Sequence, residues 1–331
     1  MDTPQSGRPR TQQGPSAKAA GREAAAAVRE PAAGRVPAAG REPAAGTAGA
    51  ALAGYLRAQA AALRALEAAV RRDEPDAVHR MRVAARRLRS ALAACRPLLR
   101  EGARTRALGE RLRELGQVLG RARDAETSGA RLTEQARALP PVAGPEQLAA
   151  AITRWSAERY RQVHREAVRF LDGDGYFTLL ADVERFAARP PLRRRARGGR
   201  PVLEALLREE QRRTRRRLRA AFRVPEGARR DEALHGARKA AKRARYTAEL
   251  AGADRLARRM RDLQEALGGY QDAVVAQRLL PELADRARLT GEGGFGYGVL
   301  YAVQQTRARA DLSAARRAGR EARRRRLSRL R

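Results

Sequence analysis

Beyond the first 46 residues, large apolar side chains recur along the chain at the spacing of an α-helix. In the first such stretch, Leu52, Leu56, Leu63, Leu66 and Val70 are separated by three, four or seven residues, which places them on one helical face. The following stretches share this periodicity, while alternating β-branched runs and hairpin turns are missing. The pattern therefore predicts an all-α fold.

Turn-forming residues divide this periodic region into separate predicted helices. Residues 73–76 interrupt the first helix, and the short side chain of Asp76 is expected to be the N-cap of the second. Gly120 is expected to end the third helix, and the two prolines at 140–141 to end the fourth. The remaining first-half helices are predicted at about 77–99, 105–119 and 122–139, followed by connecting helices at 146–171 and 176–188, a linker at 190–199 and a second helical series from Pro201.

Two sequence motifs occur twice, in the same order and at similar intervals. Residues 76–89 read DAVHRMRVAARRLR and residues 232–245 read EALHGARKAAKRAR; residues 113–124 (RELGQVLGRARD) likewise match residues 261–272 (RDLQEALGGYQD). Such a repeat indicates two related structural units. We expect two pseudo-symmetric bundles of about four helices, the first at about 47–140 and the second at about 200–318, with the connecting helices at about 146–190.

The two ends of the chain differ in composition from this region. Residues 1–46 consist largely of Ala, Gly, Pro and Arg, with almost no large apolar side chain. They cannot bury enough surface to offset the entropy lost on ordering, so we expect a disordered tail. Residues 319–331 form an arginine-rich C-terminal tail, either an additional anion-binding arm or a solvated end.

The first repeated motif places cations on one face of each predicted helix. At 100° per residue, His79, Arg82, Arg86 and Arg89 lie within one narrow sector, here called the first stripe. The second stripe has the same spacing and consists of His235, Arg238, Lys242 and Arg245. No acidic residue lies between Asp76 and Glu101 or between Glu232 and Glu249. Because ordinary exposed helices mix charges to form i,i+4 pairs, these faces indicate an anion-binding surface about 15 Å long.

Neighbouring helices add further basic residues to the predicted site. Arg64 lies on the helix before the first stripe, and four arginines share one face of the helix before the second: Arg208, Arg212, Arg215 and Arg219. Two basic helices in each half could form the walls of a groove. If the halves face each other, the groove becomes a channel.

Composition supports an anionic partner and limits other classes of function. Lys and Arg number 71 against 37 Asp and Glu, a formal net charge of +34, although a GC-rich genome could account for part of the arginine. The single cysteine excludes an internal disulfide or a cysteine-cluster zinc site. With no secretory signal and no apolar run of membrane-spanning length, the expected location is the cytoplasm. No cofactor and no metal site are expected.

The motifs taken together resemble the CHAD family, named for a histidine-containing α-helical domain. The resemblance covers roughly residues 50–318 with both copies in order, and the segment from Arg238 to Tyr246 follows the family pattern Arg-Lys-x-x-Lys-Arg-x-Arg-Tyr. It implies two four-helix bundles about a pseudo-twofold axis, a central basic pore, and binding of inorganic polyphosphate without known catalysis. The residues carried over to the pore are His79, Arg82, Arg86, Arg87, Arg89, His235, Arg238, Lys239, Lys242, Arg243 and Arg245.

Several alternatives remain at this point. A nucleic-acid-binding or packaging protein fits the charge, but few aromatic side chains are placed to stack on bases. A polyphosphate-processing enzyme would need clustered carboxylates or an activated nucleophile, which the stripes do not supply. Asp124 and Asp272 are expected to cap a following helix or to pair with a motif arginine. Association with polyphosphate or storage granules is a further hypothesis.

Overall fold

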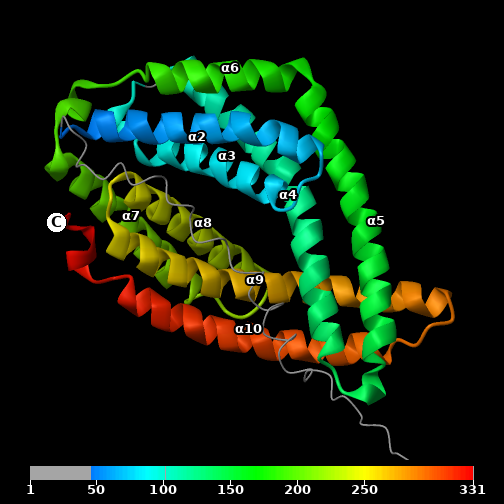
Figure 1. Ribbon diagram of the computed structural model, residues 1–331. Helices are drawn as coiled ribbons and strands as arrows, with labels where there is room; N and C mark the ends of the chain where they lie inside the picture. Colours follow the sequence, from blue (N-terminus) through cyan, green and yellow to red (C-terminus); the bar gives the residue numbers. More distant parts are fainter. Residues whose placement is uncertain (1–45, 101, 331) are drawn as a thin grey trace, which may run out of the picture. The chain divides into compact units, whose positions relative to one another are not determined.

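A computed structural model describes residues 46–100 and 102–330. Nearly all of these residues are helical (Figure 1), and within the described residues the β-type pairing is confined to a bridge between Leu99 and Leu192. The first half contains α2 (Ala48–Arg71), α3 (Ala77–Ala94), α4 (Ala103–Arg137), α5 (Pro145–Asp172) and α6 (Asp174–Ala188). The second contains α7 (Arg200–Ala221), α8 (Ala228–Leu250), α9 (Asp254–Leu289) and α10 (Phe295–Glu321). The predicted all-α fold is confirmed.

Of the two predicted tails, the C-terminal one lies almost entirely within the described residues and the N-terminal one lies almost entirely outside them. The N-terminal segment predicted to be disordered lies, up to residue 45, outside them. The arginine-rich C-terminal segment begins inside α10 and packs on α7. There the side-chain amide of Gln211 donates hydrogen bonds of 2.8 and 3.0 Å to the backbone carbonyl oxygens of Ala322 and Arg324. The carboxylate of Glu204 accepts a hydrogen bond of 2.9 Å from the backbone amide of Leu330.

Helix starts follow local chemistry in one case and tertiary structure in another. α2 begins as its sequence indicates, because the hydroxyl of Thr47 accepts a hydrogen bond of 3.1 Å from the amide of Ala50. Asp76 is the N-cap residue of α3, as predicted, but the expectation of a side-chain capping bond is wrong. Asp76 adopts a left-handed conformation with φ of 61° and makes no capping bond. Its carboxylate instead lies 3.5 Å from Arg123 of α4.

The prediction that the third helix ends at Gly120 is also wrong. α4 continues through Gly120 to Arg137 as one helix of 35 residues, and α9 continues through Gly268 in the same way. A glycine inside a helix costs only about 1 kcal/mol relative to alanine. The burial of Leu115 and Leu119 before Gly120, and of Ala122 after it, exceeds that cost, so the helix is not interrupted.

Three hydrophobic clusters among the described residues hold these helices together. The first joins α2, α3 and α6 with the adjoining parts of α4 and α5, and the second joins α7, α8, the first part of α9 and the later part of α10. These are the two predicted pseudo-symmetric bundles. Because α4 replaces two predicted helices, the remaining position in the first bundle is taken by α6.

The third cluster joins the two halves. The end of the α4–α5 hairpin packs against the end of the α9–α10 hairpin, and the two hairpins cross at the lower right of Figure 1. Leu132, Ile152, Leu280 and Leu300, one from each of the four helices, are almost completely buried there. The halves are also joined through α3 and α8, which pack against each other. Among the described residues, no helix is both long and apolar enough to span a membrane.

Candidate polyanion-binding site

The two helices that carry the stripes are packed against each other. The Nε atom of Arg86 on α3 donates a hydrogen bond of 2.9 Å to the hydroxyl of Tyr246 on α8. The electrostatic surroundings of Arg82 also extend across the two halves. Burial lowers the pKa of Arg82, the carboxylate of Asp124 opposes this, and the charges of Arg86 and Arg238 lower it further. One arginine from each stripe therefore lies in the other's electric field.

The aspartate at the end of the second repeated motif makes a different contact in each half. Asp124 lies inside α4, and its Oδ1 atom accepts an ion-paired hydrogen bond of 3.2 Å from Arg82. This is the predicted pairing with a motif arginine, whereas capping of a following helix is excluded by the continuous helix. Asp272 lies inside α9 and pairs instead with Arg131 of α4, which is outside both stripes.

The two stripe histidines are withdrawn from solvent to different degrees. His79 is 9% exposed, and His235 is half-buried with its Nδ1 hydrogen-bonded to the side-chain oxygen of Gln271. Burial lowers the pKa of His235. The Gln271 bond opposes this shift, and the charges of Lys239, Arg238 and Lys242 add to it. The cationic neighbours and burial thus act in the same direction, with burial as the larger cause.

The C-terminal end of the first stripe gains a cationic neighbour from α4. Burial lowers the pKa of Arg89, and the charges of Arg86 and Arg113 add to the effect, while Glu110 opposes it. Arg113 was not among the predicted site residues. It stands at the start of the second repeated motif, so the repeat itself could have drawn attention to it.

Carboxylates that are largely withdrawn from solvent pair with Arg87, Arg243 and Arg245, whereas the Asp124 that pairs with Arg82 is 69% exposed. Glu249 bridges Arg87 of α3, at 3.1 Å, and Arg245 of α8, also at 3.1 Å. Arg243 makes a two-pronged pair with Glu210 of α7, at 2.6 and 2.7 Å. The side chains of Arg87, Arg245 and Glu249 are only 12%, 3% and 17% exposed. These arginines are placed to hold the helices together through their carboxylate partners.

Tyr246 is the centre of this inter-half contact. Its side chain is buried, and the guanidinium carbons of Arg86, Arg87 and Arg245 lie 5.8, 5.6 and 5.0 Å from its ring centroid. Such distances allow cation–π attraction. Tyr246 ends the repeated motif in the sequence, but nothing local to it predicted contacts with arginines of the other half.

The predicted basic residues on the preceding helices do not gather in the same way. Arg64 pairs with Glu184 of α6, with one bond of 2.8 Å, on the side of α2 that faces α6. On α7, Arg208 pairs with Glu204 at 3.4 Å and Arg212 pairs with Glu209 at 3.8 Å, so both arginines find partners on their own helix. Arg219 is exposed. The Nε atom of Arg215 is buried and lacks a hydrogen-bond partner among the described residues.

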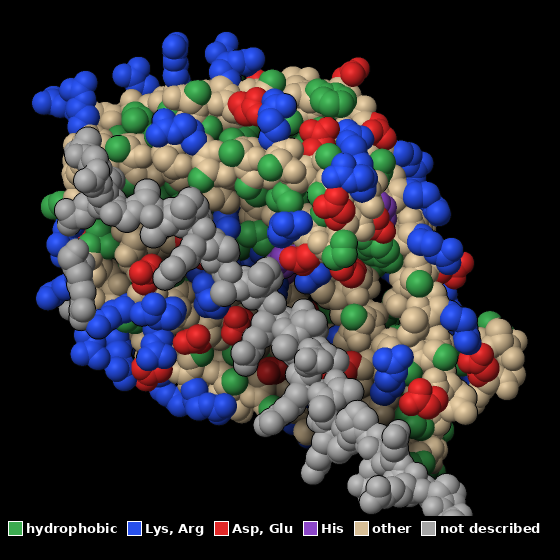
Figure 2. Space-filling view, viewed as in Figure 1, with side chains coloured by type: hydrophobic (Ala, Val, Ile, Leu, Met, Phe, Trp, Pro, Cys, Tyr) green, Lys and Arg blue, Asp and Glu red, His purple; other side chains and the backbone are tan. Residues whose placement is uncertain are grey.

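A different α7 arginine approaches the repeated motif. Burial lowers the pKa of Arg213, and the charge of Arg243 contributes to the same shift. On the face seen in Figure 2, arginines are widespread and carboxylates lie among them. This face therefore has the mixed charges of an ordinary exposed surface, in contrast to the stripes.

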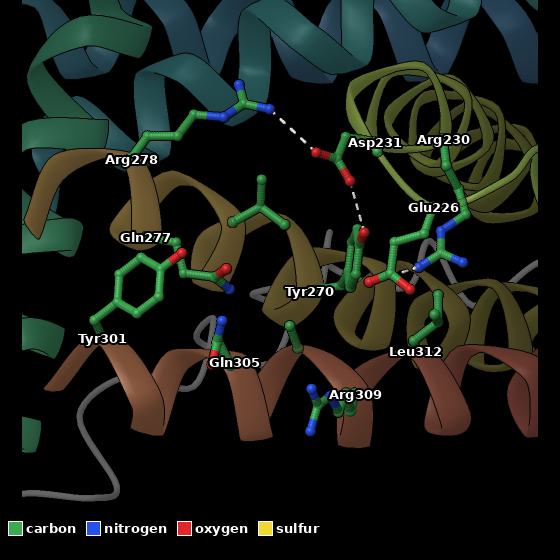
Figure 3. A pocket seen from close by; sticks show the side chains of 13 residues that line it. Glu226, Arg230, Asp231, Tyr270, Gln277, Arg278, Tyr301, Gln305, Arg309 and Leu312 are labelled. Atoms are coloured by element: carbon green, nitrogen blue, oxygen red, sulfur yellow. Dashed lines mark hydrogen bonds and ion pairs between the residues drawn. The ribbon is translucent and has the colours of Figure 1, made fainter. Parts of the chain in front are cut away.

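A separate cavity of about 290 Å³ lies between the start of α8, α9 and α10 (Figure 3). Asp231, one helical turn before His235, accepts hydrogen bonds from the Tyr270 hydroxyl at 2.6 Å and from Arg278 at 3.1 Å. Arg230 pairs with Glu226 at 3.4 Å on the same side. The carboxylates of the cavity are thus held by its own donors. Among the described residues, no three His, Cys, Asp or Glu side chains gather where they could hold a metal ion.

The sequence of this chain is similar to a known protein family and to two curated proteins. A family model for the CHAD domain matches residues 54–281. Two uncharacterized proteins of Mycobacterium tuberculosis, from strains CDC 1551 / Oshkosh and ATCC 25618 / H37Rv, are each 33% identical over 234 residues, covering 69% of this chain and 44% of the relative. The chain therefore matches less than half the length of these curated relatives.

Two solved structures share the fold. PptA from Streptomyces chartreusis superposes with a TM-score of 0.70 at 21% identity, covering 83% of this chain and 99% of that one, and at this identity the likeness shows the fold alone. The CHAD domain from the plant Ricinus communis superposes with a TM-score of 0.62 at 27% identity, covering 83% of this chain and 92% of that one.

Proposed function

We propose, from the premise that the chain belongs to the CHAD family, that this protein binds inorganic polyphosphate between its two stripes without acting on it chemically. One observation carries the proposal: the two stripe helices, α3 and α8, pack against each other, with Arg86 of the first stripe bonded at 2.9 Å to Tyr246, the residue after Arg245 of the second. The charge of Arg238 also contributes to lowering the pKa of Arg82. Gathering like charges in a partly buried place is unfavourable by itself. A bound polyanion would remove that cost, because each of its phosphoryl groups accepts charge-assisted hydrogen bonds.

The internal ion pairs restrict which predicted residues contact the ligand. We assign contact with polyphosphate to His79, Arg82, Arg86, Arg89, His235, Arg238, Lys239 and Lys242. We assign Arg87, Arg243 and Arg245 to the framework, since their partners Glu249 and Glu210 are largely withdrawn from solvent, whereas the Asp124 that pairs with Arg82 is exposed. We do not assign ligand contact to the predicted arginines of α2 and α7, because they do not gather beside the stripes. These are Arg64, Arg208, Arg212, Arg215 and Arg219.

A linear, flexible polyanion fits this arrangement better than a nucleic acid does. Each stripe extends along about 15 Å of helix, which suits several consecutive phosphoryl groups. The aromatic ring at the contact, that of Tyr246, is buried among arginines and is not available to stack on a base. We place the protein in the cytoplasm with polyphosphate granules, which imaging of a fluorescent fusion together with a polyphosphate stain would test.

The decisive experiment is a titration with long-chain polyphosphate, duplex DNA and RNA at physiological salt. We expect the tightest binding to polyphosphate, with an affinity that falls steeply as salt rises because counterions are released. Tighter binding to either nucleic acid would overturn the proposal. Release of phosphate from polyphosphate in the presence of Mg²⁺ would contradict the non-catalytic role.

A matched set of variants tests the location of the site. Charge reversal at Arg82, Arg86, Arg238 and Lys242 is expected to abolish binding while the helical circular dichroism signal remains. The control reverses four exposed arginines outside the stripes, Arg104, Arg106, Arg165 and Arg258, and so removes the same net charge. Equal losses in both variants would mean that net charge, and not the stripes, determines binding.

A further inference from the structure

We propose that Gly120 and Gly268 are positioning residues that form seats for the guanidinium groups of Arg82 and Arg238, and this inference rests on the proposed function for its binding readout. A seat here means a stretch of bare helix backbone against which a guanidinium lies. The two glycines occupy the same place in the second repeated motif, following Leu119 and Leu267. Each half of the protein therefore contains one seat.

The contacts at the two glycines are equivalent. A methyl group added at Gly120 would have, as its three nearest atoms, Nε and one terminal nitrogen of Arg82 at 3.6 Å and the guanidinium carbon at 3.8 Å. At Gly268 the three nearest atoms belong to the same group of Arg238, at 3.1, 3.2 and 3.6 Å. At Gly268 the stripe arginine lies within the space that a methyl group needs, and at Gly120 it lies at the edge of that space, where a larger side chain would meet it.

Other reasons for a glycine do not apply at these positions. Both residues lie inside long helices, so neither ends a helix, and neither has the positive φ that favours glycine. Glycine is the least favourable residue for a helix interior after proline. What glycine supplies at these two positions is space.

The seats have a consequence for binding. A long arginine side chain loses much rotational freedom when it is fixed on a ligand. Packing against the helix backbone fixes part of that freedom before the ligand arrives, and Asp124 supports the same position of Arg82. The two seated guanidinium groups can then receive neighbouring phosphoryl groups of one chain with little rearrangement.

The distances predict a graded series of effects. Ala at 268 would lie 3.1–3.2 Å from Arg238 and must displace it, whereas Ala at 120 would make ordinary contact with Arg82 at 3.6 Å. We expect Gly268→Ala to weaken polyphosphate binding about threefold and Gly120→Ala to change it less than twofold. Gly268→Leu and Gly120→Leu should each weaken it roughly tenfold or more, the equivalent of losing one charge-assisted hydrogen bond.

Gly116 provides the matched control on α4, because nothing lies within 4 Å of a methyl group added there. Gly116→Ala and Gly116→Leu are expected to leave polyphosphate affinity unchanged. A loss with Gly116→Leu as large as with Gly120→Leu would refute the inference. So would equal affinities for wild type, Gly268→Ala and Gly268→Leu.

A double-variant cycle separates the seat from the proposed function. In the Arg238→Ala background, Gly268→Leu should cause no further loss of polyphosphate binding, because the group that it displaces is gone. In urea unfolding, which needs no ligand, Gly268→Ala should stabilise the protein more with Ala at 238 than with Arg there. Additive effects in urea would refute the seat even if polyphosphate binds. Coupling in urea without any polyphosphate binding would refute the proposed function and leave the seat intact.

Discussion

Arg86 and Tyr246 are 160 residues apart in sequence, and the Nε of the first donates a hydrogen bond of 2.9 Å to the hydroxyl of the second. The bond crosses from α3 to α8 and thus from one half of the repeat to the other. It uses a stripe residue that the proposed function assigns to polyphosphate. On that proposal, fixing the two halves together and binding an anion depend on the same side chain.

Replacing Tyr246 by phenylalanine removes this hydrogen bond and keeps the ring. Because the site is buried and the partner is charged, we expect the free energy of unfolding to fall by about 1–2 kcal/mol. The free energy of polyphosphate binding should change by less than this. Urea denaturation measures the first and titration the second. Tyr55→Phe is the control, since the Tyr55 hydroxyl is buried without a hydrogen-bond partner among the described residues. A loss of stability in Tyr55→Phe equal to that in Tyr246→Phe would contradict this account.

Replacing Glu249 by leucine leaves Arg87 and Arg245 as buried charges without their shared carboxylate. The expected cost is about 3–5 kcal/mol of unfolding free energy, as for other buried ion pairs that lose one partner. Glu249→Gln keeps an acceptor oxygen and should cost less. The control is Glu184→Leu, whose pair with Arg64 is 37% and 61% exposed and is worth at most about 1 kcal/mol. Similar losses in the two leucine variants would show that burial does not govern these pairs.

His235 makes both stability and binding depend on pH. Burial keeps its pKa below the ordinary 6.5 in the folded protein, so below that pH the unfolded chain binds more protons. The free energy of unfolding should therefore decrease as pH falls below 6.5, and less so in His235→Gln. A polyanion favours the imidazolium, so binding at pH 6.5 should take up protons. Calorimetry in two buffers of different ionisation enthalpy measures this uptake. An uptake that is unchanged in His235→Gln would contradict the assignment of the proton to His235.

Cys95 reports on the integrity of the first bundle. It is fully buried, and burial raises the pKa of its thiol to about 12. At pH 8 a thiol reagent should therefore label the folded protein far more slowly than a free cysteine, whose pKa is about 8.5. Labelling should become fast in concentrated guanidinium chloride. Rapid labelling of the native protein would show that α3 does not stay packed, and the assay also checks the folding of each variant above.

The parts of the structure that sequence analysis predicted are those with a local period or a repeat. The stripes follow from residue spacing on a single helix, and the two bundles follow from the duplicated motifs. The errors arose where a local signal competed with tertiary packing. Gly120 is a common helix-ending residue, but α4 passes through it because its neighbours are buried on both sides.

Long-range pairs left no such trace in the sequence. Glu249 lies 162 residues from Arg87, and neither residue's neighbours indicate the contact. The predicted acid-free face between Glu232 and Glu249 in fact ends at a carboxylate that pairs with two motif arginines. The seats of Arg82 and Arg238 were likewise hidden, although both glycines stood in the repeat.

The third hydrophobic cluster has a mechanical consequence. Since the halves meet through α3 and α8 and again where the two long hairpins cross, they form a closed frame that cannot swing apart about a single hinge. Opening the halves at one of these junctions would have to break the other. We therefore expect α3 and α8 to keep their relative positions whether or not a ligand is bound.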